Sequence, residues 1–406
     1  MLAVFDRTHS AIAIAALLFA WQALPAFLVP AVVARVEASA RRRELSALYV
    51  FEAIVTAGLA VLLWHFWLPA VLLLAALDGT AALAASALLR AEVAKAARDQ
   101  VEAQPGDETR PDESREEDAQ EAERKANAAL NVAFSATFVA GPVLGGVVVA
   151  AAGAPAALFI DVGSFLICGA LLIDLHPHIE EAADSVRARL RAAWRHIVEA
   201  PTLRGLLLME AVALVFFNSA GPIEVTYAKA TLRAGDGGFG LLLTAWGAGA
   251  VLGSIVFARS LRRPLGVLLS AGTLAVGLAY VGFAAAPTLG LACVAALVGG
   301  VGNGVELPSL FSLVQRLSPQ NLHGRLMGAV ESLTALSVAI GLPLGGALVA
   351  LSSSRAAFLV VGLGTVGASV ALLRISRRRP VPVVDVEERP LMAASPVSEL
   401  HEPSLH

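Results

Sequence analysis

The sequence is poor in cysteine and in charged residues, and each shortage narrows what the protein can be. Only two cysteines, Cys168 and Cys293, occur among the 406 residues, and both lie inside apolar stretches. The sequence therefore predicts small packing residues at these positions rather than a disulfide framework. Charged residues make up 16% of the chain, whereas soluble domains carry about 25%. This difference disfavours a soluble globular protein.

No motif of a catalytic, metal-binding or phosphate-binding site occurs in the sequence. The Gly-rich segment 299–304 (GGVGNG) lacks the Lys-Ser/Thr pair that follows a phosphate-binding loop. We therefore predict no enzymatic activity, no cofactor, no metal and no nucleic-acid partner. We also predict no cleavable signal peptide, because the first apolar run, 11–34, is too long and has no small-residue cleavage pattern.

Apolar residues, in contrast, are abundant and make up 57% of the chain. They gather in blocks of about 20 residues, the length that a helix needs to cross about 30 Å of hydrocarbon. Because backbone groups in lipid must pair within the segment, these blocks predict the helices of an all-α polytopic membrane protein. The eleven predicted spans lie near 11–34, 45–65, 67–89, 128–152, 156–175, 203–228, 238–258, 265–286, 289–314, 326–351 and 355–374.

The basic residues are distributed unevenly between these spans. Most of the 30 Lys and Arg residues fall in alternate segments, which include the clusters 41–43 and 377–379. The segments on the other side hold Arg7, Lys229, Arg233 and Arg355. Because positively charged loops stay on the cytoplasmic side, this asymmetry predicts a multi-pass protein of the cell membrane with a cytoplasmic C-terminus.

Three polar stretches interrupt or follow the spans. The acidic stretch 95–126 contains a run, 99–124, that is poor in apolar residues and broken by prolines, which predicts a solvated, disordered loop. The stretch 176–202 has an apolar stripe over 181–200 with basic residues between, as in a helix that lies along the inner membrane surface. The tail, 376–406, is predicted to be disordered and cytoplasmic.

One segment of the sequence is repeated. Residues 139–150 (VAGPVLGGVVVA) match residues 339–350 (AIGLPLGGALVA) at six positions, with an offset of 200 residues. The offset becomes 224 between 32–35 (VVAR) and 256–259 (VFAR). The acidic stretch accounts for this difference as an insertion into the first copy, so we predict a duplicated unit.

The duplication divides the chain into two parallel bundles, an N-terminal one over 1–175 and a C-terminal one over 203–375. Five predicted spans fall in the first bundle and six in the second. The span 203–228 has no counterpart, because at an offset of 224 its partner would lie almost entirely before Met1. We therefore expect either that the first bundle has lost one helix or that the sequence begins inside a longer protein. Transporters are built from two such bundles, which rock about a central site.

The sequence resembles the major facilitator superfamily over nearly its whole hydrophobic length. The two half-repeats, the long central loop and GPVLGG (141–146) carry this resemblance, and GPVLGG is similar to the antiporter motif of the family's fifth transmembrane helix. The chain departs from the family in its first gating loop, where Ala34 replaces the usual Asp beside Arg35. The strings that resemble the macrolide-efflux and enterobactin-exporter-like branch are AALFIDVGSFLICGALL (156–172), GPIEVTY (221–227), GFGLLLTAWGAGAVLGS (238–254) and GRLMG (324–328).

The resemblance implies a secondary active transporter, a monomer in the lipid bilayer that exports drug-like or siderophore-like small molecules. Transport would proceed by alternating access and be coupled to protons, with Arg35 and Arg259 in cytoplasmic gating loops. The alternative is a truncated or degenerate member that no longer transports and serves as a membrane sensor or scaffold. The missing helix and the altered gating loop favour this alternative, whereas the acids within the spans favour transport.

The residues expected to carry chemistry are acids within the apolar spans. A charged side chain in hydrocarbon costs roughly 2.5–3.5 kcal/mol, so each acid should face a cavity for proton coupling or cation binding, or a helix to which it hydrogen-bonds. Phe216, Phe217 and Trp246 are expected either to line a substrate cavity or to pack as ordinary apolar side chains. The polar candidates are Asp78, Glu306, Glu52, Glu331, Glu210, Asp161, Asn218 and Asn303.

The repeated motif predicts a bend and a close helix contact. Pro142 removes a backbone donor and bends its helix, and Gly141, Gly145 and Gly146 let a neighbouring helix approach closely. A bent, tight seam that discourages leak is the functional interpretation, and ordinary small-residue packing is the alternative. Pro343 predicts a similar bend in the second copy.

Overall fold

The structure is a computed structural model that describes residues 1–28, 44–102, 112–173, 197–260, 263–317 and 323–378. These residues form helices joined by turns, and no strand occurs among them, which confirms the predicted all-α class. The elements are α1 (Leu2–Thr8), α2 (Ala11–Leu18), the π-helical turn η1 (Phe19–Ala23), α4 (Glu44–Leu62), α5 (Leu68–Glu102), α6 (Asp112–Leu171), α8 (Pro201–Thr226), the π-helical turn η2 (Tyr227–Thr231), α9 (Gly235–Arg259), α10 (Leu265–Ala285), α11 (Leu289–Arg316), α12 (His323–Leu351) and α13 (Ser354–Arg378).

Ten segments of the described residues are long and apolar enough to cross a membrane. Each of them corresponds to one of the eleven spans predicted from the sequence. The remaining predicted span, 128–152, lies within α6 and is helical, but it is not one of these ten. The helices are therefore those of a polytopic membrane protein, as the distribution of apolar residues predicts.

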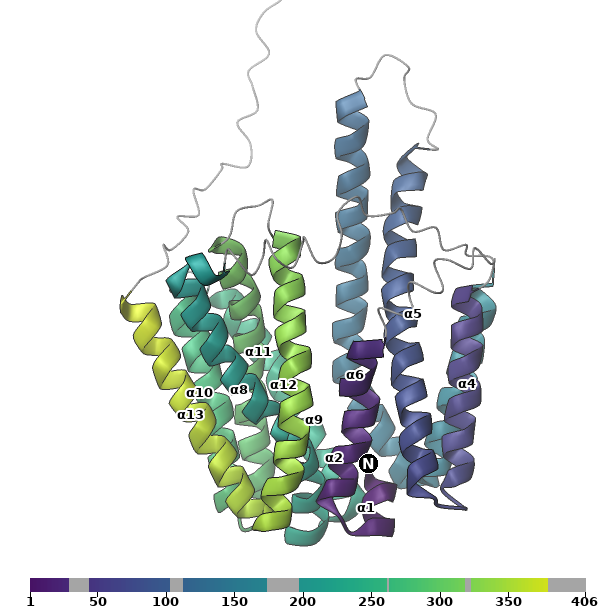
Figure 1. Cartoon of the computed structure of the whole chain (residues 1–406), viewed down its shortest axis with the longest axis vertical. Coiled ribbons are helices and arrows are strands. Elements are labelled where there is room, and N and C mark those ends of the chain that lie inside the picture. The colour runs from purple at the N-terminus through teal and green to yellow at the C-terminus, as the bar shows by residue number, and fades with distance from the viewer. Residues whose placement is uncertain (29–43, 103–111, 174–196, 261–262, 318–322, 379–406) are drawn as a thin grey trace, which may run out of the picture.

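The helices form two groups that lie side by side (Figure 1). The first group contains α1 to α6 and the second contains α8 to α13. They meet where α2 packs against α8 and α12, and where α6 packs against α9. Helices from both halves of the chain thus contribute to the interface at the centre of the molecule.

A break within α6 turns the chain back on itself. Gly153 has φ 82° and ψ 165°, a backbone conformation that is open to glycine and strained for other residues. Beyond the break, Phe159 lies against Trp64, just past the end of α4, and Gly169 accepts a hydrogen bond from Ser46, near its start. The second arm of α6 therefore runs antiparallel to α4, as expected for a separate span.

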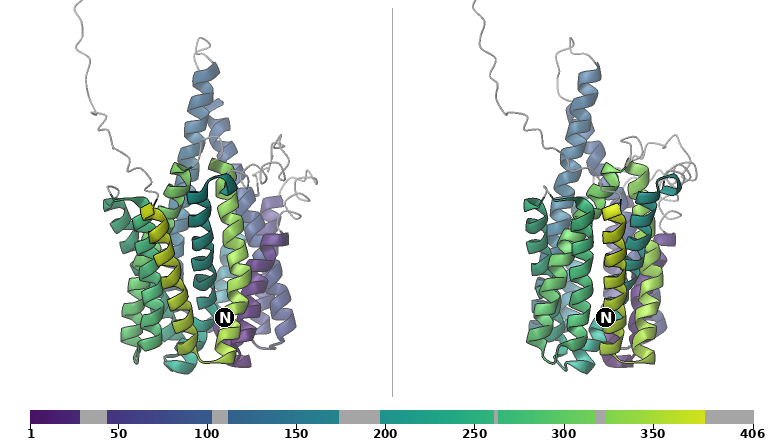
Figure 2. Two further views of the ribbon diagram at one scale, coloured as in Figure 1. Left: turned by 60° about the vertical axis from the view of Figure 1, so that its left-hand side comes forward. Right: turned by 90° about the vertical axis from the view of Figure 1, so that its left-hand side faces the viewer.

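The acidic stretch is helical where the structure describes it, so the predicted disordered loop is wrong for residues 99–102 and 112–124, and residues 103–111 lie outside the described residues. The helix α5 continues to Glu102 and α6 begins at Asp112, and both rise beyond the other helices (Figure 2). Composition explains this, because Ala, Glu, Gln, Lys and Arg are strong helix formers, and the two prolines lie in the connection between the helices. An ion pair one turn apart, between Glu121 and Lys125 at 2.7 Å, adds to the helix.

Glycines hold α9 and α11 together in the second group. At Gly300 on α11, an added Cβ would lie 2.0 Å from the carbonyl oxygen of Trp246, and at Gly249 on α9 it would lie 2.2 Å from that of Leu297. The two backbones therefore touch, as small residues allow in membrane helices. The Gly-rich segment 299–304 serves helix packing, a role that the sequence analysis did not assign to it.

The second copy of the repeated motif, on α12, is closely packed. An added Cβ at Gly345 would lie 2.0 Å from the carbonyl oxygen of Ser219 on α8, and one at Gly346 would lie 2.7 Å from the Cβ of Ala15 on α2. The glycines of this copy thus allow α12 to pack closely against α8 of the second group and α2 of the first. Pro343 precedes Gly345 and Gly346 in α12. For this copy the sequence predicted only a bend at Pro343, and the close helix contacts are seen in the structure.

The first copy, on α6, is open in the described structure. Nothing lies within 4 Å of a Cβ added at Gly141 or at Gly145, whereas the corresponding face of α12 is covered by α8. The seam predicted for this copy is therefore not found at these two glycines. The side chain of Pro142 and the surroundings of Gly146 lie outside the described residues.

Some predicted features fall where the structure is not described. They are Arg35 in the first gating loop, the amphipathic helix over 181–200 as far as residue 196, and the tail beyond residue 378. The first three residues of the predicted tail, 376–378, belong to α13 and are helical.

Candidate functional site

Two acids of the first group, Glu52 and Asp161, interact with Asp78 on α5 or with each other. The Asp78 carboxyl accepts hydrogen bonds from Trp21 Nε1 and from Thr56 Oγ1, each at 3.1 Å. Glu52, one turn before Thr56 on α4, is 1% exposed, and Asp78 acts on its carboxyl electrostatically. Asp161 on α6 acts on both acids. The structure thus brings together three candidates that the sequence placed on separate spans.

Gly79, next to Asp78 on α5, allows the close approach of Trp21, which donates a hydrogen bond to Asp78. Trp21 lies in η1, and π-helical turns of this kind occur frequently at functional sites. The backbone of η1 approaches α5 at Gly79, where an added Cβ would lie 2.0 Å from the carbonyl oxygen of Trp21. This close approach brings the indole within hydrogen-bonding distance of the carboxyl on the preceding residue.

The second acid cluster is a pair formed by Glu210 on α8 and Glu306 on α11. Glu210 is fully buried and Glu306 is 5% exposed, and each carboxyl acts on the other. Thr273 Oγ1 on α10 donates a hydrogen bond to Glu306 Oε1 at 2.8 Å. Both acids were candidates from the sequence, but their pairing follows only from how the three helices pack.

An aromatic cluster lies near this pair. Tyr280 on α10 is 1% exposed and stacks on Trp246, with ring centroids 6.0 Å apart. Trp246 also contacts Phe217 on α8 at 6.1 Å, and Tyr280 contacts Phe358 on α13 at 5.8 Å. Glu306 acts electrostatically on Tyr280. The sequence analysis singled out Phe217 and Trp246 and missed Tyr280, whose phenol within an apolar span was the available signal.

The remaining candidates are not joined to either acid cluster by the described contacts. Glu331 on α12 is exposed, and Asn303 on α11 is half-buried. Asn218 donates a hydrogen bond at 2.8 Å to the carbonyl oxygen of Leu214, within its own helix. Asn218 also lies where α12 crosses α8 at Gly341, so its described contacts are those of helix packing.

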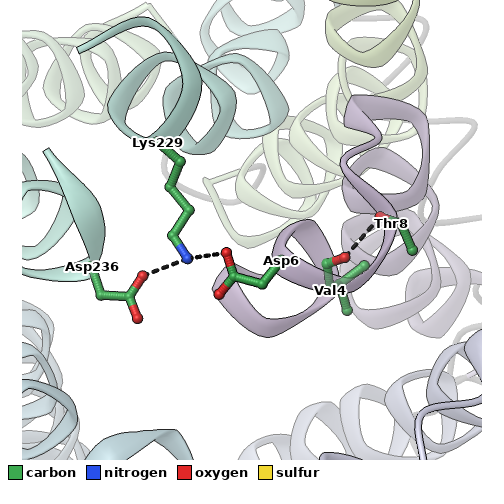
Figure 3. Close-up of polar contacts among 5 residues, drawn as sticks. All are labelled: Val4, Asp6, Thr8, Lys229 and Asp236. Carbon is green, nitrogen blue, oxygen red and sulfur yellow. Dashed lines mark hydrogen bonds and ion pairs between the residues drawn. The ribbon is translucent and has the colours of Figure 1, made fainter. Parts of the chain in front are cut away.

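Lys229 forms an ion-pair cluster at the end of the molecule opposite the α5 and α6 extensions (Figure 3). Its Nζ lies 2.5 Å from Oδ1 of Asp6 on α1 and 2.5 Å from Oδ1 of Asp236 on α9. The lysine side chain is 10% exposed, and those of the aspartates are 52% and 42% exposed. Because Asp6 belongs to the first group and Asp236 to the second, Lys229 links the two groups.

The sequence analysis assigned no role to Lys229 beyond its side of the membrane. Lys229 could have been singled out from the sequence, because the chain has only three lysines and this one directly follows the apolar residues of α8. Arg259, the gating candidate of the second half, is exposed and ends α9 at the opposite end of the molecule. Basic residues thus mark both ends of the second group.

Comparison with known proteins gives relatives for much of the chain. A family model described as Major Facilitator Superfamily matches residues 206–403. The multidrug efflux pump Tap of Mycolicibacterium fortuitum is 27% identical over 266 residues, which cover 63% of this chain and 64% of that protein. The multidrug efflux pump Tap of Mycobacterium tuberculosis (strain ATCC 25618 / H37Rv) is 26% identical over 282 residues, 66% of each. These matches span slightly less than two thirds of the relatives' lengths.

Solved structures share the fold over almost all of the chain. The nucleoside transporter NupG superposes with a TM-score of 0.66 at 12% identity, over 92% of this chain and 93% of that one. A bacterial homologue of the iron transporter ferroportin, in an inward-facing state, superposes with a TM-score of 0.63 at 16% identity, over 92% of both chains. At these identities the likeness concerns the arrangement of helices.

Proposed function

Because the chain belongs to the major facilitator superfamily, we propose that it is a secondary active transporter that exports small molecules across the cell membrane. The family and the solved relatives are transporters rather than enzymes. The relatives named multidrug efflux pumps support a drug-like cargo. The strings similar to the enterobactin-exporter-like branch support a siderophore-like cargo as the second choice.

The observation that carries the proposal is the Lys229 cluster. It is an ionic contact between the two groups of helices, located at one end of the molecule, between Asp6 of the first group and η2 and α9 of the second. Alternating access requires contacts of this kind, which hold one end closed and can be released. Partly exposed ion pairs contribute only about 0–1 kcal/mol each, so the cluster can break in every cycle.

The charge asymmetry of the loops supports an orientation in which the Lys229 end faces the outside of the cell. Arginines end α9, α11 and α13 at the opposite end, where basic residues favour the cytoplasm. In this orientation the structure represents a state that is closed toward the outside. A small molecule would enter from the cytoplasm or the inner leaflet and leave after the cluster separates.

We further propose that Asp78 takes part in proton coupling. Asp161 acts on Asp78, and Asp78 in turn acts on Glu52, and like-charged neighbours disfavour full ionisation of such a cluster. Trp21 and Thr56 donate hydrogen bonds that stabilise an ionised Asp78. The cluster therefore holds features that favour each of its protonation states, which suits a group that must bind and release a proton.

Dye export by cells tests this function. In bacteria that lack their own efflux pumps, expression of the protein should lower ethidium accumulation, and a protonophore should abolish the effect. Asp78→Asn should reduce the export rate at least tenfold, because the amide cannot exchange a proton. The matched control, Asp99→Asn on the exposed extension of α5, should export like the wild type. Equal export by Asp78→Asn and the wild type would refute the coupling role.

A second candidate function, a non-transporting membrane sensor or scaffold, is favoured by the open face of α6. The glycines of the repeated motif are covered on α12 and uncovered at Gly141 and Gly145 in the described structure. A first group that is incompletely packed would not sustain a transport cycle. The same assay separates the two functions, since a sensor or scaffold would leave ethidium accumulation unchanged at normal expression levels.

A further inference from the structure

Glu210 and Glu306 lie beside each other in the interior of the second group of helices, although they come from α8 and α11. Both are at least nine-tenths buried. In the part of the chain that the structure describes, neither oxygen of Glu210 makes a hydrogen bond. Buried polar groups nearly always have partners, so this carboxyl requires a chemical explanation.

No cation among the described residues offsets the two acids. The groups that act on Glu210 and Glu306 are each other and Thr273 on α10. The other ionisable groups of this region are Tyr280 on α10 and Glu224 on α8, and neither can carry a positive charge. The described parts of α9, α12 and α13 direct no charged group at the pair.

Two interacting carboxylates that are both buried away from water oppose each other's ionisation. Burial and like-charge repulsion each oppose the second negative charge. Protonation of at least one of the two is therefore favoured, and the titration belongs to the pair rather than to either residue. A proton between the carboxyls would also supply the hydrogen bond that Glu210 lacks, because a protonated carboxyl donates and an ionised one accepts.

Thr273 can adapt to either protonation state of Glu306. Its Oγ1 lies 2.8 Å from Glu306 Oε1 and 3.0 Å from the carbonyl oxygen of Leu269. A hydroxyl has one hydrogen, so it can donate to only one of these oxygens at a time. It can donate to an ionised Glu306, or donate to Leu269 and accept from a protonated Glu306. The hydroxyl is thus a suitable partner for a group that gains and loses a proton.

Close helix packing covers the pair on one side. At Gly272 on α10, an added Cβ would lie 2.8 Å from the backbone nitrogen of Glu306 and 2.7 Å from the carbonyl oxygen of Gly302. The backbones of α10 and α11 therefore touch beside the carboxyls and leave no room there for water. This packing therefore restricts the access of water to the pair from the side of α10.

We propose that Glu210 and Glu306 form a proton-binding dyad in the second group of helices, in which the two carboxyls share a proton. Loss of this proton would leave two adjacent carboxylates, whose repulsion favours separation of α8 from α11. Because α8 continues directly into η2, such a movement would reach Lys229 and the contact between the two groups. This role in the cycle rests on the proposed transport function, whereas protonation of the dyad does not.

Infrared spectroscopy of the purified full-length protein in lipid nanodiscs tests the protonation. At neutral pH, the difference between the wild type and Glu210→Gln/Glu306→Gln should contain the C=O stretching band of a protonated carboxyl, which shifts in D₂O. Glu199→Gln, which alters an exposed acid just before α8, should give no such band. Absence of the band from the wild-type-minus-double-variant difference would overturn the proposal.

A second variant keeps the test decisive if the double variant does not fold. Thr273→Val preserves the shape of the side chain and removes the hydroxyl that lies against Glu306. It should shift the frequency of the protonated-carboxyl band of the wild type. A wild-type spectrum with no protonated-carboxyl band that responds to Thr273→Val would also overturn the dyad.

Transport measurements test the role of the dyad in the cycle. In proteoliposomes, Glu306→Gln should reduce ethidium uptake driven by a pH gradient at least tenfold, while ethidium exchange without a gradient continues. Loss of both activities would indicate a structural role, and unchanged gradient-driven uptake would exclude a coupling role. If the wild type moves no ethidium, the proposed export of such cations fails, and the infrared result still decides whether the dyad exists.

Discussion

At the scale of single residues, the polar groups within this apolar chain lie where different helices meet. Asp78 receives donors from η1 and α4, Glu306 meets Glu210 and Thr273, and Lys229 joins Asp6 to Asp236. The sequence identified most of the acids, because an acid in an apolar span is conspicuous. It could not pair them, because their partners are far away along the chain and are set by helix rotation. Lys229 was missed because a basic residue at the end of a span is usually interfacial.

The Lys229 cluster predicts a test by charge reversal. Lys229→Asp places three acids together, so this end, which we propose faces outward, should open and a cysteine introduced at Thr226 should react several-fold faster with a membrane-impermeant maleimide on whole cells. Asp6→Lys combined with Lys229→Asp restores opposite charges and should return labelling toward the wild-type rate. All variants carry Ser in place of both native cysteines.

The control for this experiment is Arg233→Gln, which removes an exposed positive charge close to the cluster along the chain. Labelling should remain at the wild-type rate in this variant. Equal labelling of Lys229→Asp and Arg233→Gln would show that the ion pairs do not hold the two groups together.

At the scale of elements, glycine decides which helices touch. The α9–α11 crossing depends on glycines at Gly249 and Gly300, and the α8–α12 crossing depends on Gly345. Local sequence predicted the helices themselves, but not which helices approach closely. From its high charge, the acidic stretch was predicted to be disordered. Its described residues are helical, because Ala, Glu, Gln, Lys and Arg are strong helix formers. Its prolines, which would interrupt a helix, fall in the connection between α5 and α6.

The two copies of the repeated motif allow one substitution to be compared in two environments. Gly345→Ala on α12 should destabilise the protein by about 1–3 kcal/mol, because the added methyl group meets a carbonyl oxygen and forces the backbones apart. Gly145→Ala on α6 should leave stability unchanged or raise it by up to about 1 kcal/mol, because nothing lies near the methyl group and Ala favours helix.

The apparent melting temperature of the purified protein in detergent measures both effects. A lower melting temperature for Gly145→Ala, comparable to that of Gly345→Ala, would mean that another helix covers the first copy in solution.

At the scale of the whole molecule, the two groups of helices are joined through α2, α6 and the Lys229 cluster. The chain shares this arrangement with solved transporters at TM-scores of 0.66 and 0.63. Transport by alternating access requires the groups to move relative to each other. The Lys229 end is where that movement can be blocked without altering either acid cluster.

A reversible cross-link at this end should stop transport. In a background without native cysteines, Asp6→Cys and Lys229→Cys joined by a flexible, reducible bis-maleimide should lose ethidium export, because the two groups can no longer separate there. Reduction of the linker should restore export to the level measured before the reagent was added. A monofunctional maleimide serves as the control. Full export by the cross-linked protein would contradict separation at this end.

The sequence by itself determined the class of protein and the positions of the membrane helices, and it predicted an internal duplication. These properties depend on hydrophobicity and on matches along the chain, which are local. The tertiary structure decided which polar residues meet: Glu210 with Glu306, Trp21 with Asp78, and Lys229 with Asp6. These contacts depend on the rotation and crossing of helices, which are set by close backbone approaches at residues such as Gly79 and Gly272. No pattern within a single helix specifies which face its neighbour will present.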